Sequence, residues 1–410
     1  MKKIAILIDL ELSKKSGGHV KFWERICESL KEEILEIKME LFFLGKKSDT
    51  KKINKFISFN KLKPLLSTRN LRFIGIDADY TDIFPFNFGL FLKLRKFDLI
   101  HTTDQLFAMS RTARLASFFW KIPLTTSFHT DTPSYSKYYL LKILNSFPNI
   151  LKNLLIEKIK LHEKVSVKQK SKILDYFNQC KKIMICKSNL KTELKTFKNK
   201  EKLINLERGI NKSIFIKKKI NKKSVLSKFD INKKNKIILF CGRIHELKGA
   251  IFLSEVHKKL KEKGVGVTTI LIGENIHGKV CKKIGGTGLL VLDYLNQDEI
   301  SVLMNICDLF VFPSLYETGP QVVLEAKSCE AVCVVSPNGG GKRIKNNIDG
   351  IIVKKYKVCD WTKVIYDLFA EREKIKKIKN YLNKNDTQPS WKDVFFNNFY
   401  NNWKKILNVS

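Results

Sequence analysis

Residues 309–326 read LFVFPSLYETGPQVVLEA, and this stretch decides the fold class. Its first four residues form a short apolar run that is typical of a buried parallel strand. Gly319 and Pro320 then indicate a turn with proline at the first position of a helix, which the following apolar residues continue. We therefore predict a strand, a loop that carries Glu317, and a helix that carries Glu325 about a turn and a half from its start.

The same alternation of short apolar runs and longer stretches of helical period extends along the 410 residues. Parallel strands that are covered by helices on both faces produce this pattern. We expect an α/β protein with two Rossmann-like, doubly wound domains that face a cleft between them. The further apolar runs occupy residues 4–8, 99–101, 124–128, 183–186, 237–240, 267–272 and 332–335.

The expected domains are residues 1–205 and residues 206–387, and a C-terminal helix at about 388–410 is expected to pack back on the first domain. The Lys- and Asn-rich stretch 212–236 is interpreted as the junction or as a surface loop beside it. In open α/β sheets, ligands bind at the carboxyl ends of the strands. The cleft between the two sheets is therefore the expected site.

The chain is strongly basic, with 77 Lys and Arg against 40 Asp and Glu and a formal charge of +37. Only ten of these cations are Arg, the usual bidentate reader of bases and phosphates, and no nucleic-acid-binding motif accompanies them. We therefore expect no specific nucleic-acid partner. The excess of Lys is explained either by biased coding composition or by contact with an anionic membrane surface, which requires only point charges.

Nine cysteines are scattered along the chain without a CxxC pair, a distribution typical of free thiols in a reducing compartment. No apolar run reaches the length of about 18 residues that a membrane span requires. We expect a cytoplasmic protein that is at most peripheral on the cytoplasmic face of a membrane, and we identify no metal site.

Three motifs in the sequence have alternative interpretations when each is taken alone. Gly17 and Gly18, between the first strand and a helical pattern, form either a phosphate-binding turn or a structural one. Arg243 and Lys248 follow a strand and a glycine, and they either clamp a diphosphate or are solvated surface residues. The two carboxylates in 309–326 bind hydroxyl groups, or they are a loop carboxylate in water and a helix-surface Glu.

The order of these motifs resembles that of retaining glycosyltransferases of family 4, which have the GT-B fold. Glu317 and Glu325 form the E-x7-E pattern of that group, and the surrounding PS-x-x-E-x7-EA is similar to family 4. Further landmarks in the family's order are the GG loop, FHTD at 128–131, RGIN at 208–211 with Phe215, GR-x4-KG at 242–249, LIGE at 271–274 and the closing SW at 390–391. The resemblance covers nearly the whole chain.

The resemblance implies roles for individual residues. Arg243 and Lys248 would bind the donor diphosphate, Glu325 the nucleotide ribose, and Glu317 the transferred sugar. His129 would lie near the reacting sugar and the acceptor, in a first domain that binds the acceptor while the second binds the donor. The catalytic set is thus His129, Glu317, Arg243 and Lys248, and the donor-binding set adds Glu325, Gly17, Gly18, Gly319, Pro320 and Gln321. Asp131 is either a further site residue or the cap of the following helix.

By the same resemblance, the donor would be a UDP- or GDP-sugar, the configuration would be retained, and neither a cofactor nor a metal would be required. The acceptor is expected to be a membrane lipid or a lipid-linked or cell-envelope glycan. Residues 138–158 mix large apolar residues with Lys, as basic amphipathic helices on anionic bilayers do, or as core-facing helices with lysines in water do.

The chain departs from the family pattern at Pro320, Glu330, Val332 and Arg343. The family usually has Gly at the first of these positions, often Gly and Pro at the next two, and frequently Glu at the last. Because the departures lie on the donor side, the alternative function is a catalytically silent nucleotide-sugar-binding or scaffold protein with a GT-B fold.

Overall fold

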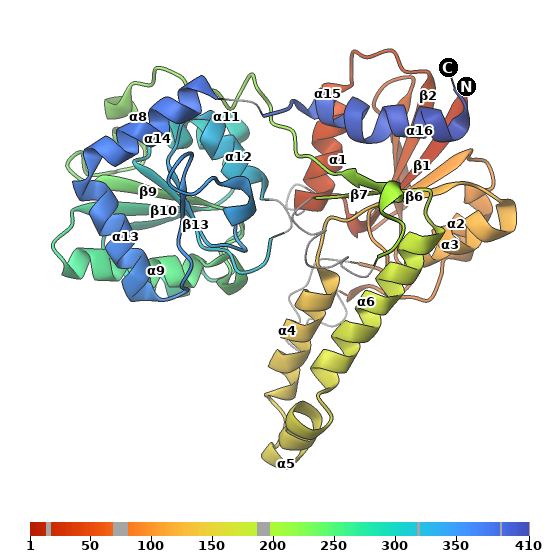
Figure 1. Cartoon of the computed structure of the whole chain (residues 1–410), viewed down its shortest axis with the longest axis horizontal. Coiled ribbons are helices and arrows are strands. Elements are labelled where there is room, and N and C mark those ends of the chain that lie inside the picture. Colours follow the sequence, from red (N-terminus) through yellow and green to blue (C-terminus); the bar gives the residue numbers. More distant parts are fainter. Residues whose placement is uncertain (14–17, 69–80, 187–196, 318–319, 386–387, 410) are drawn as a thin grey trace. The chain divides into compact units, whose positions relative to one another are not determined.

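The computed structural model describes residues 1–13, 18–68, 81–186, 197–317, 320–385 and 388–409. The chain divides into two compact units, one formed by Met1–Arg208 with Trp391–Ser410 and the other by Gly209–Ser390 (Figure 1). The boundaries predicted from the sequence lie after residues 205 and 387. Gly17 and Gly319, which belong to the expected donor-binding set, lie outside the described residues.

The N-terminal unit is built on an eight-stranded sheet with the order β3-β4-β2-β1-β5-β6-β7-β8. All neighbours are parallel except β3, which runs antiparallel at the edge. Helices flank this sheet, and the middle of its central strand β1, residues 4–8, is apolar and buried. The strands are β1 (Lys2–Glu11), β2 (Ile37–Leu44), β3 (Asp49–Lys52), β4 (Ile57–Leu62), β5 (Leu99–Thr102), β6 (Leu124–Ser127), β7 (Lys182–Ile185) and β8 (Leu203–Asn205).

The C-terminal segment of the chain packs against the first helix of the N-terminal unit. Trp403 stacks parallel to Trp23 of α1 at 6.4 Å, and Phe22 meets the edges of Trp391 and Phe399 at 5.3 and 5.9 Å. This aromatic layer is buried in the core beneath β1 and β2. The helices of the unit are α1 (Gly18–Ser29), α2 (Phe88–Leu94), α3 (Ala108–Trp120), α4 (Thr132–Leu144), α5 (Asn149–Asn153), α6 (Leu161–Gln179), α15 (Trp391–Val394) and α16 (Asn401–Leu407).

The C-terminal unit contains a fully parallel, six-stranded sheet with the order β11-β10-β9-β12-β13-β14. The strands are β9 (Lys236–Cys241), β10 (Val267–Ile272), β11 (Leu289–Leu292), β12 (Leu309–Phe312), β13 (Cys333–Val335) and β14 (Ile351–Ile352). The helices are α8 (Lys222–Lys228), α9 (Ala250–Glu262), α10 (Gly278–Gly285), α11 (Gln297–Ile306), α12 (Gln321–Ser328), α13 (Val358–Ala370) and α14 (Arg372–Lys384).

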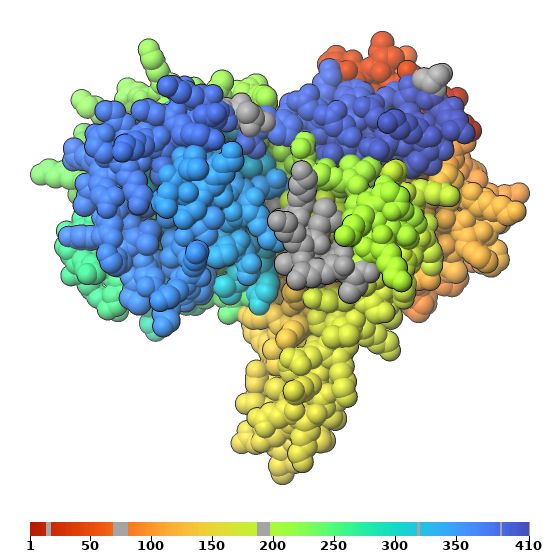
Figure 2. Space-filling view, viewed as in Figure 1, coloured from red at the N-terminus to blue at the C-terminus, as the bar shows by residue number. Residues whose placement is uncertain are grey.

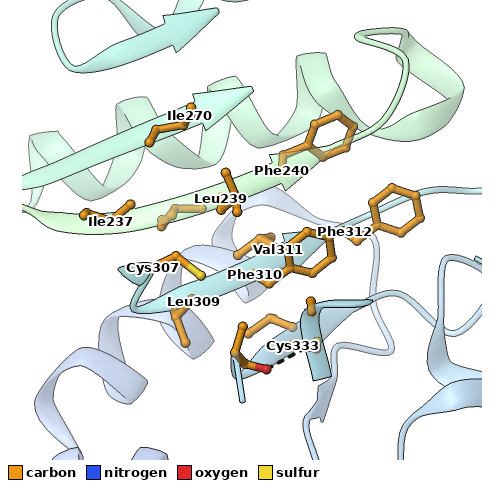
Figure 3. Close-up of a cluster of buried hydrophobic side chains, with 14 of the residues drawn as sticks. Ile237, Leu239, Phe240, Ile270, Cys307, Leu309, Phe310, Val311, Phe312 and Cys333 are labelled. Atoms are coloured by element: carbon orange, nitrogen blue, oxygen red, sulfur yellow. Dashed lines mark hydrogen bonds between the residues drawn. The ribbon is translucent and has the colours of Figure 1, made fainter. Parts of the chain in front are cut away.

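The two central strands of this sheet, β9 and β12, carry the core of the unit. Figure 3 shows Phe240 and Phe312 at their carboxyl ends, with rings stacked at 5.6 Å. Leu239 and Phe310 lie deeper in the same cluster and are completely buried. The two strands pair in parallel, and both are apolar and buried toward their carboxyl ends, so these ends lie side by side at the middle of the sheet.

Two segments differ from the sequence-based interpretation. The stretch 212–236 contains a helix, α8, because Asn221 caps its first turn and Leu226 packs into the core. In the region 138–158, α4 buries only Pro133 and Leu144, and α5 buries no residue, so α5 is not a core-facing helix. Among the described residues, none of the helices has both the length and the apolar character needed to cross a membrane.

Candidate functional site

The strand order brings two of the predicted motifs together in the C-terminal unit. The chain leaves β9 toward β10 on one side, whereas β12 lies on its other side, so the order reverses between β9 and β12. Such a switch point leaves a crevice at the carboxyl ends, where α/β sheets bind ligands. Gly242 and Arg243 follow β9 directly, and Pro313 to Glu317 follow β12.

Lys248 and Glu317, which are far apart in sequence, form an ion pair at this edge. Lys248 Nζ donates to Glu317 Oε1 at 2.6 Å, and Ser314 Oγ lies 3.3 Å from the same oxygen. The two charged side chains are only 17% and 15% exposed. A paired cation and carboxylate in a partly dry crevice interact more strongly than the same pair in water. The interpretation of Lys248 and Glu317 as solvated surface residues is therefore wrong.

A close backbone approach fixes the position of this pair. Ser314 Oγ donates to Leu247 O at 3.1 Å, and Leu315 N donates to the same carbonyl at 3.0 Å. Gly249 has φ of 81°, and a Cβ there would lie 2.8 Å from the carbonyl carbon of Pro313 and still closer to its oxygen. Only glycine allows this contact without displacing the backbone. The glycine that follows Lys248 is thus a packing requirement of the site.

The helix that follows, α12, provides the second carboxylate and a free acceptor. Glu325 is 3% exposed, so it is not a helix-surface residue. Gln321, the first residue of the helix, donates through its side chain to Gly209 O, and its buried Oε1 has no hydrogen-bond partner among the described residues. Pro320 occupies the N-cap and has no side-chain acceptor, so it does not cap the amides of the first turn. Such amides favour an anion.

The loop after β13 lies behind the same site. A Cβ on Gly339 would lie 2.6 Å from Ser314 O and closer still to Ser336 Oγ. Ser336 Oγ also donates to Ser314 O, at 2.5 Å. On the β9 side, Gly273, with φ of 137°, approaches Gly242 so closely that a Cβ would collide with its carbonyl oxygen. The backbone around Arg243 is therefore fixed by its neighbours, while its side chain is half-buried.

His129 lies in the N-terminal unit, two residues after β6. Its ring is 5% exposed, stacks on His19 of α1 at 4.7 Å and meets Phe22 edge-on at 4.8 Å. Burial lowers the pKa of His129 well below its usual value, and the nearby His19 and Arg208 lower it further.

Gly18, a member of the predicted donor-binding set, begins α1. A Cβ there would have no atom within 4 Å, so the packing of the described residues does not require glycine at this position.

A chain of hydrogen bonds determines which ring nitrogen of His129 carries the proton. The Thr125 hydroxyl donates to Ile100 O at 3.4 Å, so it must accept from His101 Nδ1, which lies at 3.0 Å. Burial lowers the pKa of His101 to about 3, so its Nε2 is an unprotonated acceptor for Ser127 Oγ at 3.0 Å. Since that hydroxyl has one proton, His129 Nε2 is the donor in the 2.7 Å bond to Ser127. His129 is thus neutral, with a lone pair on Nδ1.

This arrangement predicts the protonation state of His129 in solution. Long-range ¹H–¹⁵N correlation spectra are expected to show the neutral form with the proton on Nε2 between about pH 5.5 and 8, because the folded pKa lies below the usual value. Ser127→Ala removes the acceptor and should abolish the preference for Nε2. Ser110→Ala, at a buried hydroxyl that bonds Phe107 O, is the control and should leave the spectrum of His129 unchanged. A dominant Nδ1–H form, or titration near pH 6.5, would contradict the assignment.

The comparisons with known proteins bear on the C-terminal unit first. Residues 198–385 match the family described as glycosyl transferases group 1. The matched stretch covers nearly all of the C-terminal unit. The resemblance expected from the E-x7-E pattern is therefore confirmed for this part of the chain.

Two relatives match parts of this chain. The N,N'-diacetylbacillosaminyl-diphospho-undecaprenol α-1,3-N-acetylgalactosaminyltransferase of Campylobacter jejuni is 32% identical over 145 residues, which are 35% of this chain and 38% of the relative. The UDP-Gal:α-D-GlcNAc-diphosphoundecaprenol α-1,3-galactosyltransferase of Escherichia coli is 39% identical over 67 residues, 16% of this chain and 17% of the relative. The matched stretches thus span well under half of the length of either relative.

A solved structure establishes the fold over the whole chain. Anabaena HepE, in complex with UDP and glucose, superimposes with a TM-score of 0.67 and 15% identity, and the match covers 100% of both chains. The expected GT-B architecture with two parallel-sheet units is therefore confirmed. At this level of identity, the likeness concerns the fold alone.

The structure shows the surroundings of two departures from the family pattern. Glu330 has φ of 57°, the left-handed conformation that glycine adopts without strain at the end of a helix. This chain has a side chain there, in place of the Gly that the family pattern often has. Val332 is completely buried in the core, where its side chain fills space beside β13.

Sequence reasoning missed several residues that hold the predicted ones in place. Ser314, Ser127 and His19 each contact a predicted site residue, and His101 bonds Ser127. Ser314 belongs to the PS-x-x-E motif and His19 follows the GG loop directly, whereas Ser127 and His101 had no motif of their own. Asp131 caps α4 by accepting from Ser134 N, which supports the capping interpretation. Within the described ranges, no group of three or more His, Cys, Asp or Glu side chains could hold a metal ion.

Proposed function

We propose that this protein moves a sugar from a nucleotide-sugar donor to a lipid-linked glycan or membrane lipid, with retention of anomeric configuration. The observation that carries the donor half of this proposal is the Lys248–Glu317 pair at the switch point of the C-terminal sheet. The structure of Anabaena HepE with UDP and glucose supports a nucleotide-sugar donor. The names of the two bacterial relatives support a diphosphoundecaprenol-linked acceptor.

In this proposal, the donor diphosphate takes Lys248 away from Glu317. A diphosphate carries more negative charge than one carboxylate, so Lys248 and Arg243 would neutralise it together with the amides at the start of α12. Glu317 is then released to accept hydrogen bonds from hydroxyls of the transferred sugar. Glu325 is buried and lies one helical turn after Gln321 on α12, where it would accept hydrogen bonds from the ribose. Gln321 Oε1 would be an additional acceptor beside it.

The chemical step follows from this arrangement of charges. The acceptor hydroxyl oxygen bonds to the anomeric carbon on the face from which the diphosphate departs, and a leaving phosphate oxygen takes the hydroxyl proton. The positive groups stabilise the charge that develops on the leaving diphosphate, so the proposal requires neither a metal nor a cofactor. His129 accepts a hydroxyl hydrogen bond at Nδ1, because its Nε2 proton is held by Ser127.

The first experiment is a thermal-shift screen with UDP, GDP, ADP and their common sugar conjugates. A ligand at about 100 times its dissociation constant adds roughly 2.7 kcal/mol to the free energy of unfolding. We expect a selective shift for one nucleotide and its sugar conjugate, and loss of that shift in Glu325→Ala. Glu255→Ala, at an exposed position on α9, is the matched control and should retain the shift.

The possible outcomes separate the two candidate functions. A selective shift with sugar transfer or donor hydrolysis supports the glycosyltransferase reaction. A selective shift with neither, over a broad acceptor panel, would favour the silent binding protein suggested by Pro320 and Arg343. No shift with any nucleotide would contradict donor binding altogether.

A further inference from the structure

A helical arm projects from the sheet of the N-terminal unit. It comprises residues 132–179, in which α4 and α6 lie side by side and α5 caps their far end (Figure 1). With 19 residues at about 1.5 Å each, α6 is roughly 28 Å long. Lys137 of α4 pairs with Glu163 of α6 at 3.3 Å. The space-filling view shows the arm standing out from the sheet-bearing part of this unit (Figure 2).

The end of the arm presents large apolar side chains to solvent. We call residues 145–160 the tip. Ile150 is 89% exposed, and Phe147, Leu151 and Leu154 are 37%, 41% and 42% exposed. Neither α5 nor the π-helical turn Leu154–Lys158 that follows it contains a buried residue. The tip therefore has no role in the core of its own unit, and four clustered apolar side chains of this size mark a binding surface.

The charge around the tip indicates the chemistry of what it binds. Residues 142–164 contain five lysines against two glutamates. Lys142, Lys158, Lys160 and Lys164 are all exposed. Apolar side chains at a projecting end, surrounded by flexible cations, match a surface that is apolar inside and anionic outside, which is the arrangement of an anionic bilayer.

We propose that the tip of the arm inserts into the surface of an anionic lipid bilayer, with its four apolar side chains below the headgroups and the surrounding lysines at their level. The inference deepens the proposed function, on which its biological use rests, because it would hold the N-terminal unit at the membrane that contains a lipid-linked acceptor. It replaces the picture of amphipathic helices lying flat, since α4 packs along α6 while α5, at the end of the arm, buries no residue.

The test is sedimentation of the full chain with vesicles, without nucleotide or acceptor. Vesicles of phosphatidylcholine with about 30% phosphatidylglycerol, which supplies a negative surface potential, are compared with phosphatidylcholine alone. We expect wild type to bind the anionic vesicles and Ile150→Asp to bind them about tenfold more weakly. Ile348→Asp is the matched control, since Ile348 is 47% exposed in the C-terminal unit, and it should bind as wild type does.

A second variant tests the contribution of the lysines separately from that of the apolar side chains. Replacing Lys158 and Lys160 by Gln leaves the apolar side chains in place and should also weaken binding to the anionic vesicles, about thirtyfold, since each lysine near the surface contributes about 1 kcal/mol and about 1.4 kcal/mol corresponds to a factor of ten. Unchanged binding by Ile150→Asp, or equal loss in Ile348→Asp, would overturn the proposal, as would binding that ignores lipid charge. Because no donor is present in this experiment, a loss of vesicle binding is distinguishable from a lack of nucleotide binding in the thermal-shift screen.

Discussion

Lys248→Ala is expected to lower kcat/KM for sugar transfer more than a hundredfold, which corresponds to a loss of about 3 kcal/mol in transition-state stabilisation. Lys248 Nζ is held 2.6 Å from Glu317 in a crevice where both side chains are largely shielded from water. If the donor diphosphate lies there, the lost cation leaves the developing charge on the leaving group less stabilised, and it also leaves Glu317 without its ionic partner. The effect should appear in kcat as well as in KM.

The matched control for this prediction is Lys259→Ala. Lys259 also pairs with a glutamate, at 2.7 Å from Glu262, but both side chains are about half exposed on α9. Exposed pairs contribute less than about 1 kcal/mol to stability, so the variant should transfer sugar at the wild-type rate. Steady-state kinetics with the donor identified in the nucleotide screen provide the measurement. Near-normal turnover by Lys248→Ala would defeat the assignment of Lys248 to the diphosphate.

Gly249→Ala is expected to destabilise the C-terminal unit by about 3 kcal/mol. A positive φ costs an alanine about 1 kcal/mol, and the close approach to the Pro313 carbonyl adds an overpacking cost of about 2 kcal/mol. Because Gly249 follows Lys248 directly, relief of the overlap must also move the Lys248–Glu317 pair. Calorimetric unfolding of the purified chain is the measurement.

Gly264→Ala isolates the packing term of that prediction. Gly264 has φ of 77°, almost the same as the 81° of Gly249, but a Cβ there would have no atom within 4 Å. Its expected cost is therefore only the backbone term of about 1 kcal/mol. Equal destabilisation by the two variants would show that the contact with Pro313 is not what requires glycine at position 249.

The departures from the family pattern have different consequences for the structure. At Glu330, the backbone has the left-handed conformation, which is strained for a residue with a side chain. Pro320 occupies the N-cap position of α12, one residue before the helical position expected from the sequence, and still leaves the first turn of the helix without a side-chain cap. Lys327 Nζ donates to the carbonyl of Arg343, the last departure, at 3.0 Å and pairs with Asp349 at 2.7 Å. These contacts hold the backbone of Arg343 in place.

The strands and the residues of the motifs were predictable from the sequence because apolar runs and turn residues act locally. The run 309–312 is β12, and the helix after it begins at Gln321. In contrast, α8 was missed because its pattern is short and rich in Lys, and its burial depends on one Leu that reaches the core. The arm was not predictable, since the same apolar residues in 138–158 could equally have faced the core or a partner.

The sequence alone determined the fold class and the identity of the charged residues at the proposed donor site, because periodicity and motif spacing depend only on neighbours along the chain. Only the tertiary structure decided that Lys248 pairs with Glu317, that Ser127 sets the tautomer of His129, and that the apolar tip of the arm stays in solvent. Each of these contacts, or the lack of one, depends on strand order and helix packing, which bring together or separate residues far apart in the chain.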